Sequence, residues 1–155
     1  MILKSDVTGV TVDGEQDSDV DGKITAITLA SGSEVHEFAF RKGAASMTSN
    51  LQKDDTAGSY FWQTDLAMNF QRMETAKRSA VMALTLAEAC AIVLDNNGLY
   101  WFLGKDEYLG ATAGTGETGQ AKTDANQYTV TLQDNSLGLP FEIDKTVAEG
   151  IIAQA

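Results

Sequence analysis

The sequence contains very little of several residues on which common functions depend. Its 155 residues include one cysteine, one histidine and one proline, and no apolar run approaches the roughly 20 residues that a membrane-crossing helix requires. Cys90 therefore cannot form an internal disulfide, and His36 cannot join a cluster of histidine ligands. The start, MILKSDVTG, also lacks the basic residues and apolar run of a secretory signal. We expect the chain to fold in a cytoplasm and to have no membrane segment.

Basic residues are also scarce. Lys and Arg number 11 against 22 Asp and Glu, which gives a formal net charge of -11. The acid is concentrated at the start, because residues 1–40 carry eight acidic and two basic residues. This balance disfavours binding that neutralises nucleic-acid phosphates and adhesion to an anionic membrane. The length suits a single domain over residues 1–155, with an acidic arm at residues 1–22.

Residue sets that carry catalysis are missing as well. No serine lies in a G-x-S-x-G motif, and Cys90 has no C-x-x-C partner. We interpret Cys90 as a buried structural thiol at the end of a helix, and His36 as a core-edge or interface histidine on one strand face with Phe38 and Phe40. We therefore expect no enzymatic activity and no cofactor.

Two motifs, one of glycines and one of acidic residues, are weak candidates for binding sites. Gly114, Gly116 and Gly119 have the G-x-G-x-x-G spacing of dinucleotide-binding loops, but alternating residues follow them and no helix begins there, so a mobile connection between strands is favoured. Asp17, Asp19 and Asp21, followed by Gly22, form D-x-D-x-D-G, a weak calcium candidate. The loop position that needs a bidentate Glu is Thr28, so a solvated acidic turn is the alternative.

The residue pattern predicts a mainly β fold of the α+β type. We expect an antiparallel β-sandwich or barrel with one amphipathic helix packed on its flank and long loops between strands. The clearest strand is 60–72, with apolar residues on one face and polar residues on the other, and the helix covers 75–90. The other predicted features are a hairpin of 23–29 with 34–40, a structureless loop at 41–59, a hairpin of 92–95 with 99–103 around a type I′ Asn-Gly turn, strands at 128–133 and 139–144, and a tail at 145–155.

This order of elements resembles the tail tube proteins of long-tailed and contractile bacteriophages, which are related to the inner tubes of contractile injection systems. The segments that carry the resemblance lie within residues 23–144: EVHEFAF, RKGAASMTSNLQKDDTAGS, SYFWQTDLAMNFQRM, ETAKRSAVMALTLAEA and LPFEID. The resemblance implies hexameric rings in which two adjacent β-hairpins per subunit join one barrel around a channel. It also implies that the rings stack into a virion tail tube, assembled in the host cytoplasm, through which DNA passes without specific binding.

The same resemblance implies partners and site residues. The partners are further copies of the chain, a tail terminator, a baseplate and, in a contractile tail, a sheath. Five polar residues are expected to face the lumen: Glu37, Gln63, Asp65, Asn69 and Gln71. Seven residues of the 41–59 loop are expected to reach the next ring and to become ordered on assembly: Arg41, Lys42, Met47, Leu51, Lys53, Asp54 and Asp55.

Two alternatives remain open from the sequence alone. One is a tail terminator or another head–tail connector component on a related fold, which would stop at a single ring. Another is a monomeric β-rich module that binds a ligand or calcium. In a monomer, the polar face of the 60–72 strand would simply be the solvent face of a sandwich.

Overall fold

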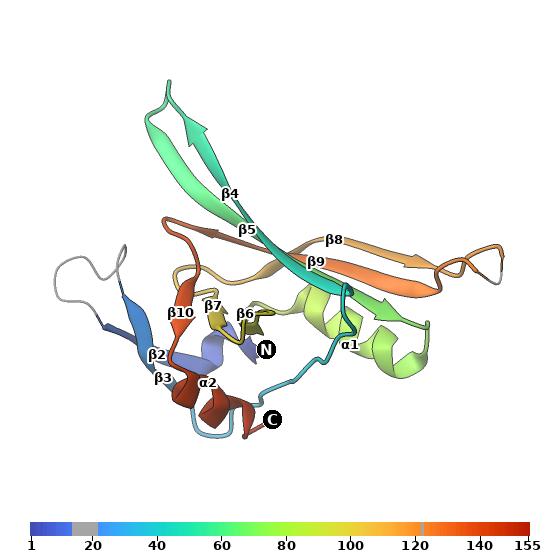
Figure 1. The fold of residues 1–155 in the computed structure, drawn as a ribbon, viewed down its shortest axis with the longest axis horizontal. Coiled ribbons are helices and arrows are strands. Elements are labelled where there is room, and N and C mark those ends of the chain that lie inside the picture. The colour runs from blue at the N-terminus through green and yellow to red at the C-terminus, as the bar shows by residue number, and fades with distance from the viewer. Residues whose placement is uncertain (14–21, 122) are drawn as a thin grey trace.

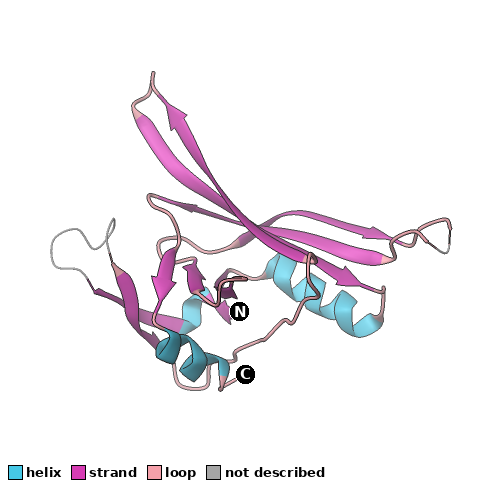
Figure 2. Ribbon diagram, in the orientation of Figure 1, coloured by secondary structure: helices cyan, strands magenta, loops and turns pink. Residues whose placement is uncertain are grey.

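The described residues form a mainly β fold with two sheets and two α-helices, which confirms the predicted fold class (Figures 1 and 2). The computed structural model describes residues 1–13, 22–121 and 123–155. The first sheet has six strands in the order β1-β6-β7-β10-β3-β2. Its strands are β1 (Ile2–Leu3), β6 (Ala89–Leu94), β7 (Tyr100–Leu103), β10 (Phe141–Ile143), β3 (Lys23–Leu29) and β2 (Val7–Asp13). A short 3-10 helix, Lys4–Asp6, joins β1 to β2.

The second sheet has four strands in the order β4-β5-β9-β8 and is antiparallel throughout. Its strands are β4 (Ala45–Asp54), β5 (Ser59–Gln71), β9 (Gln127–Ser136) and β8 (Gly110–Glu117). In Figure 1 this sheet forms the upper layer, and helix α1 (Thr75–Leu86) and the six-stranded sheet lie below it. Helix α2 (Lys145–Ile152) lies at the bottom of the same view, beside the six-stranded sheet.

The apolar residues lie between these layers. The underside of the four-stranded sheet contributes Leu66, Met68 and Phe70 from β5, with Val130 and Leu132 from β9. This cluster also includes Leu84 of α1 together with Ala91, Leu103 and Leu109. A second cluster, around Ile24, Phe102 and Ile143, joins the six-stranded sheet to Ala148 of α2. One side of the four-stranded sheet is therefore apolar and covered, as the alternation in 60–72 predicts.

Several predicted elements differ from the structure. The expected loop at 41–59 contains β4, which pairs with β5 along ten residues, and only residues 41–44 and the tip at 55–58 remain outside the strands. The expected mobile connection after Gly110 is β8, paired with β9. Residues 34–40 form no strand and instead run as an extended segment beside the N-terminus, and the expected C-terminal tail is α2. The segment Met1–Asp13 forms β1 and β2, so the described part of the expected arm is folded.

The β6–β7 hairpin forms as predicted, but its turn is not type I′. Only Gly98 has a positive φ, of 84°, whereas type I′ requires positive φ at both central residues. The Asp95 carboxylate explains the difference, because it accepts hydrogen bonds from the backbone N–H groups of Asn97 (2.7 Å) and Leu99 (3.0 Å) and from the Trp101 indole (3.0 Å). These bonds close a three-residue loop in which glycine takes the left-handed position.

Candidate functional site: the open face and free edges of the four-stranded sheet

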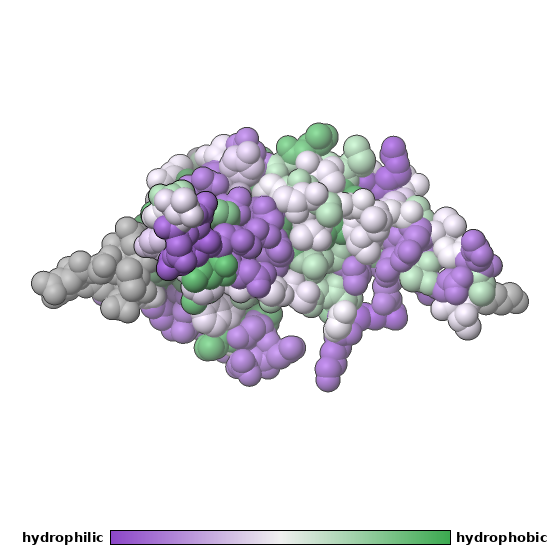
Figure 3. All heavy atoms as spheres, turned by 90° about the horizontal axis from the view of Figure 1, so that it is seen from above, coloured by the Kyte–Doolittle hydropathy of each residue, from purple (hydrophilic) through white to green (hydrophobic). Residues whose placement is uncertain are grey.

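The upper face of the four-stranded sheet carries polar side chains and is not covered by any described element (Figure 1). Strand alternation and register place one set of residues on this face. They are Ser46, Thr48, Asn50, Gln52 and Asp54 of β4, Phe61, Gln63, Asp65, Ala67, Asn69 and Gln71 of β5, Gln127, Thr129, Thr131, Gln133 and Asn135 of β9, and Ala113, Thr115 and Glu117 of β8. We call this set the open face. Figure 3, seen from above, shows this side of the molecule, where purple, white and green residues are mixed.

The open face has acidic members and no basic one. Its ionisable residues are Asp54, Asp65 and Glu117, and all others are amides, hydroxyls, small residues or Phe61. Asp65 accepts hydrogen bonds from the Gln133 amide (3.0 Å) and the Gln63 amide (3.2 Å). Each oxygen of the Asp65 carboxylate is therefore bonded to a neighbouring amide on the same face. Gln127 donates similarly to Glu117 (2.8 Å). The face therefore presents a negative, amide-rich surface.

The structure brings four of the five predicted lumen-facing residues together. Gln63, Asp65, Asn69 and Gln71 all lie on the open face. Glu37 does not, because its segment is not a strand of this sheet and lies on the opposite side, against the N-terminus. Sequence reasoning missed the contributions of β4 and β8, whose small and hydroxyl side chains lack the large apolar residues that reveal a half-buried strand.

Both outer strands of this sheet have an unpaired edge among the described residues. The backbone N–H of Asn69 donates to Ala44 O (2.8 Å), so the odd residues of β5 point toward β4. Their partners in β4 are its even residues, which leaves the N–H groups of Met47, Ser49 and Leu51 directed outward. The odd residues of β9 point toward β8, where their partners include Ala113, Thr115 and Glu117. The backbone N–H and C=O groups of Gly114 and Gly116, which lie between these partners, are therefore directed outward from the sheet.

The residues expected to contact a neighbouring ring fall into three places. Leu51, Lys53, Asp54 and Asp55 lie at the end of the β4–β5 hairpin, which projects beyond the rest of the molecule in Figure 1. Met47 packs against the core instead, so it is not available as an anchor. Arg41 and Lys42 lie in the segment before β4, at the opposite end of the sheet from the tip.

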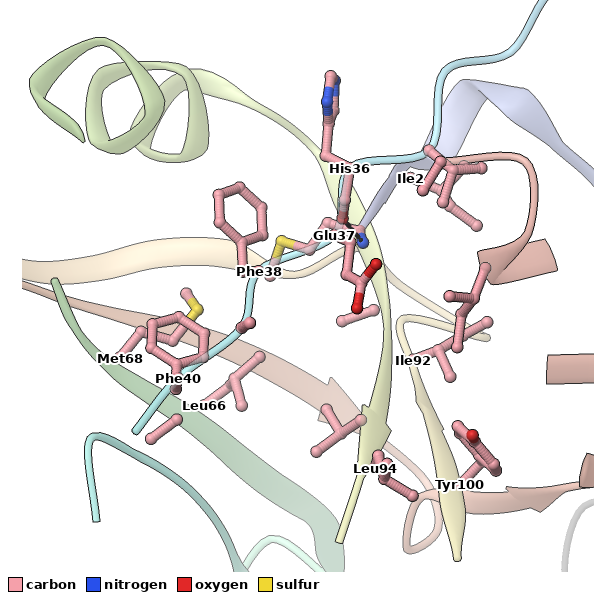
Figure 4. A pocket seen from close by; sticks show the side chains of 18 of the residues that line it. Ile2, His36, Glu37, Phe38, Phe40, Leu66, Met68, Ile92, Leu94 and Tyr100 are labelled. Carbon is pink, nitrogen blue, oxygen red and sulfur yellow. Dashed lines mark hydrogen bonds between the residues drawn. The ribbon is translucent and has the colours of Figure 1, made fainter. Parts of the chain in front are cut away.

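An apolar cavity of about 540 Å³ lies between the four-stranded sheet, β6 and the extended segment at 34–43 (Figure 4). Its walls include Phe38, Phe40, Leu66, Met68 and Ile92. The volume lies within the range of small-molecule sites, roughly 300 to 1,000 Å³.

The polar lining of this cavity includes the N-terminus, His36, Glu37, Arg41, Lys42 and Asn96. The Met1 ammonium donates to His36 O (2.6 Å), and burial lowers its pKa, while the nearby Glu37 carboxylate raises it. In Figure 4 the Glu37 side chain points inward, whereas His36 points away from the cavity. The predicted strand face shared by His36, Phe38 and Phe40 is wrong, because residues 34–40 form no strand and the His36 side chain is 64% exposed.

Two buried polar groups lie in the core below the sheet. Cys90 is fully buried, as predicted, but it lies in β6 rather than at the end of a helix, and its thiol donates to Gly104 O (3.2 Å). Asp134 is 3% exposed and accepts a hydrogen bond from the Gly104 N–H (2.9 Å), while its Oδ1 has no hydrogen-bond partner among the described residues. Burial raises the pKa of both groups, that of Cys90 to about 11.

Metal and membrane sites are not found in the described part of the chain. Its residues contain no group of three or more His, Cys, Asp or Glu side chains placed to hold a metal ion. The calcium candidates Asp17, Asp19 and Asp21 lie outside the described residues. Neither described helix has the length and apolar character that crossing a bilayer requires.

These features define a mainly β protein with an open polar sheet face and two unpaired edges. No family model, curated protein or solved structure matches this chain.

Proposed function

We propose that the chain is a structural virion protein whose four-stranded sheet joins edge to edge with copies of itself into a ring around a channel. The observation that carries the proposal is the combination of a free edge on each side of this sheet with an open face that is polar, acidic and free of cations. The channel conducts DNA, and stacked rings form a phage tail tube. The function needs no catalysis and no cofactor.

The strand directions are compatible with such a ring. The strands alternate in direction across β4-β5-β9-β8, so β4 and β8 run in opposite directions. Rotation about an axis along the channel keeps each strand direction, and β8 of one copy therefore meets β4 of the next as an antiparallel pair. The two hairpins β4–β5 and β8–β9 also lie side by side, which is the arrangement that the resemblance to tail tube proteins implies.

The two edges have few of the features that normally prevent strand pairing, and the one irregularity is a register shift between Ala111 and Ala113, near the start of β8. Charged residues, proline and strong bulges protect exposed edges in monomeric proteins. β4 carries charge only at its tip end, at Lys53 and Asp54, and β8 carries charge only at Glu117. The single proline, Pro140, lies in neither strand. The outward-facing backbone of β8 belongs to Gly114 and Gly116, which have no side chain to obstruct a neighbouring strand.

The charge of the open face suits the passage of DNA. Phosphates are attracted to Lys and Arg, and this face has neither. Asp65, near its middle, would repel phosphates, which favours sliding over retention.

Blocking one edge tests the ring. Gly114→Pro would remove an outward N–H from β8, and Gly114→Ala is the matched control, because a Cβ there meets only Thr129 O at 3.6 Å. In β4, Leu51→Pro would likewise remove an outward N–H, and Leu51→Val is its matched control. We expect rings and tubes from the wild type and both controls in negative-stain microscopy at high protein concentration, and monomers of unchanged circular dichroism from both proline variants. A wild type that stays monomeric contradicts the proposal, and single rings that never stack indicate a terminator.

The apolar cavity supports a second candidate function, a monomeric module that binds a small apolar ligand. An empty apolar cavity lowers stability, and a ligand that fills it raises the unfolding temperature by mass action. This function predicts that a fatty acid or an aromatic dye raises the melting temperature of a monomer. Leu66→Trp would fill part of the cavity and abolish the shift.

A further inference from the structure

Cationic side chains converge at one end of β5. Arg41, Arg72 and Lys77 line a single pocket of about 250 Å³. The other lining residues are Ala39, Phe40, Ala44, Asn69, Phe70 and Gln71. We call this site the basic pocket. It contains no acidic lining residue, although the whole chain has a net charge of -11, so the sign of the charge is locally reversed.

The basic pocket exists because β5 extends beyond the first residue of β4. Register pairs Ala45 with Met68, so on the β4 side the last residues of β5 have only the segment before β4 beside them. Lys77 is held there by Gln71 O (2.6 Å) and Glu74 (2.9 Å). The guanidinium groups of Arg41 and Arg72 have no ion-pair partner among the residues that the structure describes, so both remain available to an anion.

Arg72 has an unusual backbone. Its φ of 66° is the one positive value at a non-glycine residue in the described chain. Its N–H donates to Asn126 O (2.7 Å), and the next N–H, of Met73, donates to Asn126 Oδ1 (2.7 Å), which fixes the turn into α1. Glycine would adopt this conformation at lower cost, so the arginine side chain is kept at a position that disfavours it.

The opposite end of β5 carries complementary groups. The tip of the β4–β5 hairpin exposes Leu51 (49%), Tyr60 (57%) and Phe61 (40%). Its Asp54 carboxylate accepts the backbone N–H groups of Thr56 and Ala57 and so stabilises the turn. The Asp55 side chain is 82% exposed and forms an ion pair with Lys53 (2.6 Å). The tip and the basic pocket are roughly 40 Å apart, since each strand residue spans about 3.3 Å.

We propose that the basic pocket binds the hairpin tip of a second copy of this chain, with Asp55 of that copy between Arg41 and Arg72. Arginine and carboxylate form short, charge-assisted hydrogen bonds, and the apolar tip residues would contact the Phe40 and Phe70 side of the pocket. Because the two contact surfaces lie at opposite ends of one strand, the contact is head to tail and repeats without closing. The inference rests on the proposed function and assigns the contact that stacks one ring on the next.

Arg72→Gly separates this contact from folding and from ring formation. Glycine removes the guanidinium and also relieves the positive φ, so the melting temperature is expected to stay the same or to rise. Rings should still form, because β4 and β8 are untouched, but the number of stacked rings in negative-stain images should fall by about tenfold or more, which corresponds to the loss of one charge-assisted contact. Arg78→Ala, at an exposed arginine of α1 outside the pocket, is the control for lost charge, because alanine keeps the helix, and it should stack like the wild type.

A charge exchange tests the partner residue. Asp55→Arg alone and Arg41→Glu alone should each prevent stacking, and the double variant should restore it in part, because Arg72 still repels the introduced positive charge. Tubes of wild-type length from Arg72→Gly would overturn the inference and leave the ring proposal intact. Binding of inorganic phosphate to wild-type rings in calorimetry, with stacking unaffected by Asp55→Arg, would also overturn it, because the pocket would then serve a free anion. A wild type without rings would instead refute the proposed function itself.

Discussion

At the scale of single residues, Cys90 illustrates how burial controls chemistry. Its thiol is fully buried and donates to Gly104 O, and burial raises its pKa to about 11 from an ordinary value of 9.0. Thiols react as thiolates, so this cysteine is expected to be inert in the folded protein. The lone thiol is therefore a core residue rather than a reactive site.

The raised pKa of Cys90 predicts a loss of stability at alkaline pH. Between about pH 9 and pH 11 the unfolded chain releases the thiol proton while the folded chain retains it, so the unfolding free energy should fall by about 1.4 kcal/mol per pH unit. Urea titrations across this range would measure the slope. Cys90→Ala lacks the titrating group and should show a shallower decline, and equal slopes would contradict the assignment.

Asp134 predicts a second effect of pH. Burial raises the pKa of its carboxyl, so the folded state binds this proton more tightly than the unfolded state, and the charged form lowers stability as pH rises above about 4. Asp134→Asn keeps an oxygen for the Gly104 N–H and removes the charge. We expect the unfolding free energy at pH 7 to rise by about 1 kcal/mol and the gain to shrink near pH 4. A variant that is less stable at both pH values would show that the Asp134 carboxylate stabilises the folded state, which contradicts the prediction.

At the scale of elements, helix α1 is amphipathic, with its contribution to the core concentrated at one residue. Leu84 is 6% exposed and belongs to the central cluster, whereas Leu86, in the same turn, is 82% exposed. Leu84→Ala should therefore cost about 2 to 5 kcal/mol, and Leu86→Ala should change stability by about 0.5 kcal/mol or less. Thermal unfolding of the pair would measure both values, and equal effects would mean that α1 packs through a different face.

The sequence predicts elements well where one period dominates. The alternation from Tyr60 to Gln71 identifies β5, and the spacing of three and four from Ala76 to Leu84 identifies α1. The helix ends at Leu86 rather than at Cys90, because residues 89–91 pair with β1 and β7. Apolar alanines fit either structure locally, and tertiary pairing decides between them.

The elements that sequence reasoning missed have weak local signals. β4 and β8 consist largely of Ser, Thr, Ala, Gly and amide residues, and they become strands because β5 and β9 offer them a paired edge. Conversely, EVHEFAF has the alternation of a strand but finds no edge, and Phe38 and Phe40 pack edge-on against Phe70 instead. The candidate site was therefore predicted in β5 and could not be predicted in the strands beside it.

At the scale of the whole molecule, the open face depends on a pairing between segments that are far apart in the chain. β5 and β9 pair along ten residues, although more than 50 residues separate Gln71 from Gln127. This pairing joins two local hairpins into one continuous sheet and leaves both outer edges free. No local pattern specifies it, because either hairpin could have packed separately over the core. The open face is thus a property of the topology, whereas its charge is a property of individual residues such as Asp65.

Asp65→Lys tests whether the open face is a channel for DNA. Asp65 lies near the middle of the face and is half-buried between Gln63 and Gln133, so loss of its two hydrogen bonds should cost about 1 kcal/mol and leave the fold intact. In an assembled ring every copy adds a lysine at the same level of the channel, and phosphates would then be held rather than repelled. We expect rings of this variant to retain short duplex DNA at low salt and to release it as salt rises, while Asp65→Asn, which removes the negative charge without adding a cation, retains none. If the lysine variant retains DNA equally as a monomer, or if its rings retain none at low salt, the open face does not line a passage for DNA.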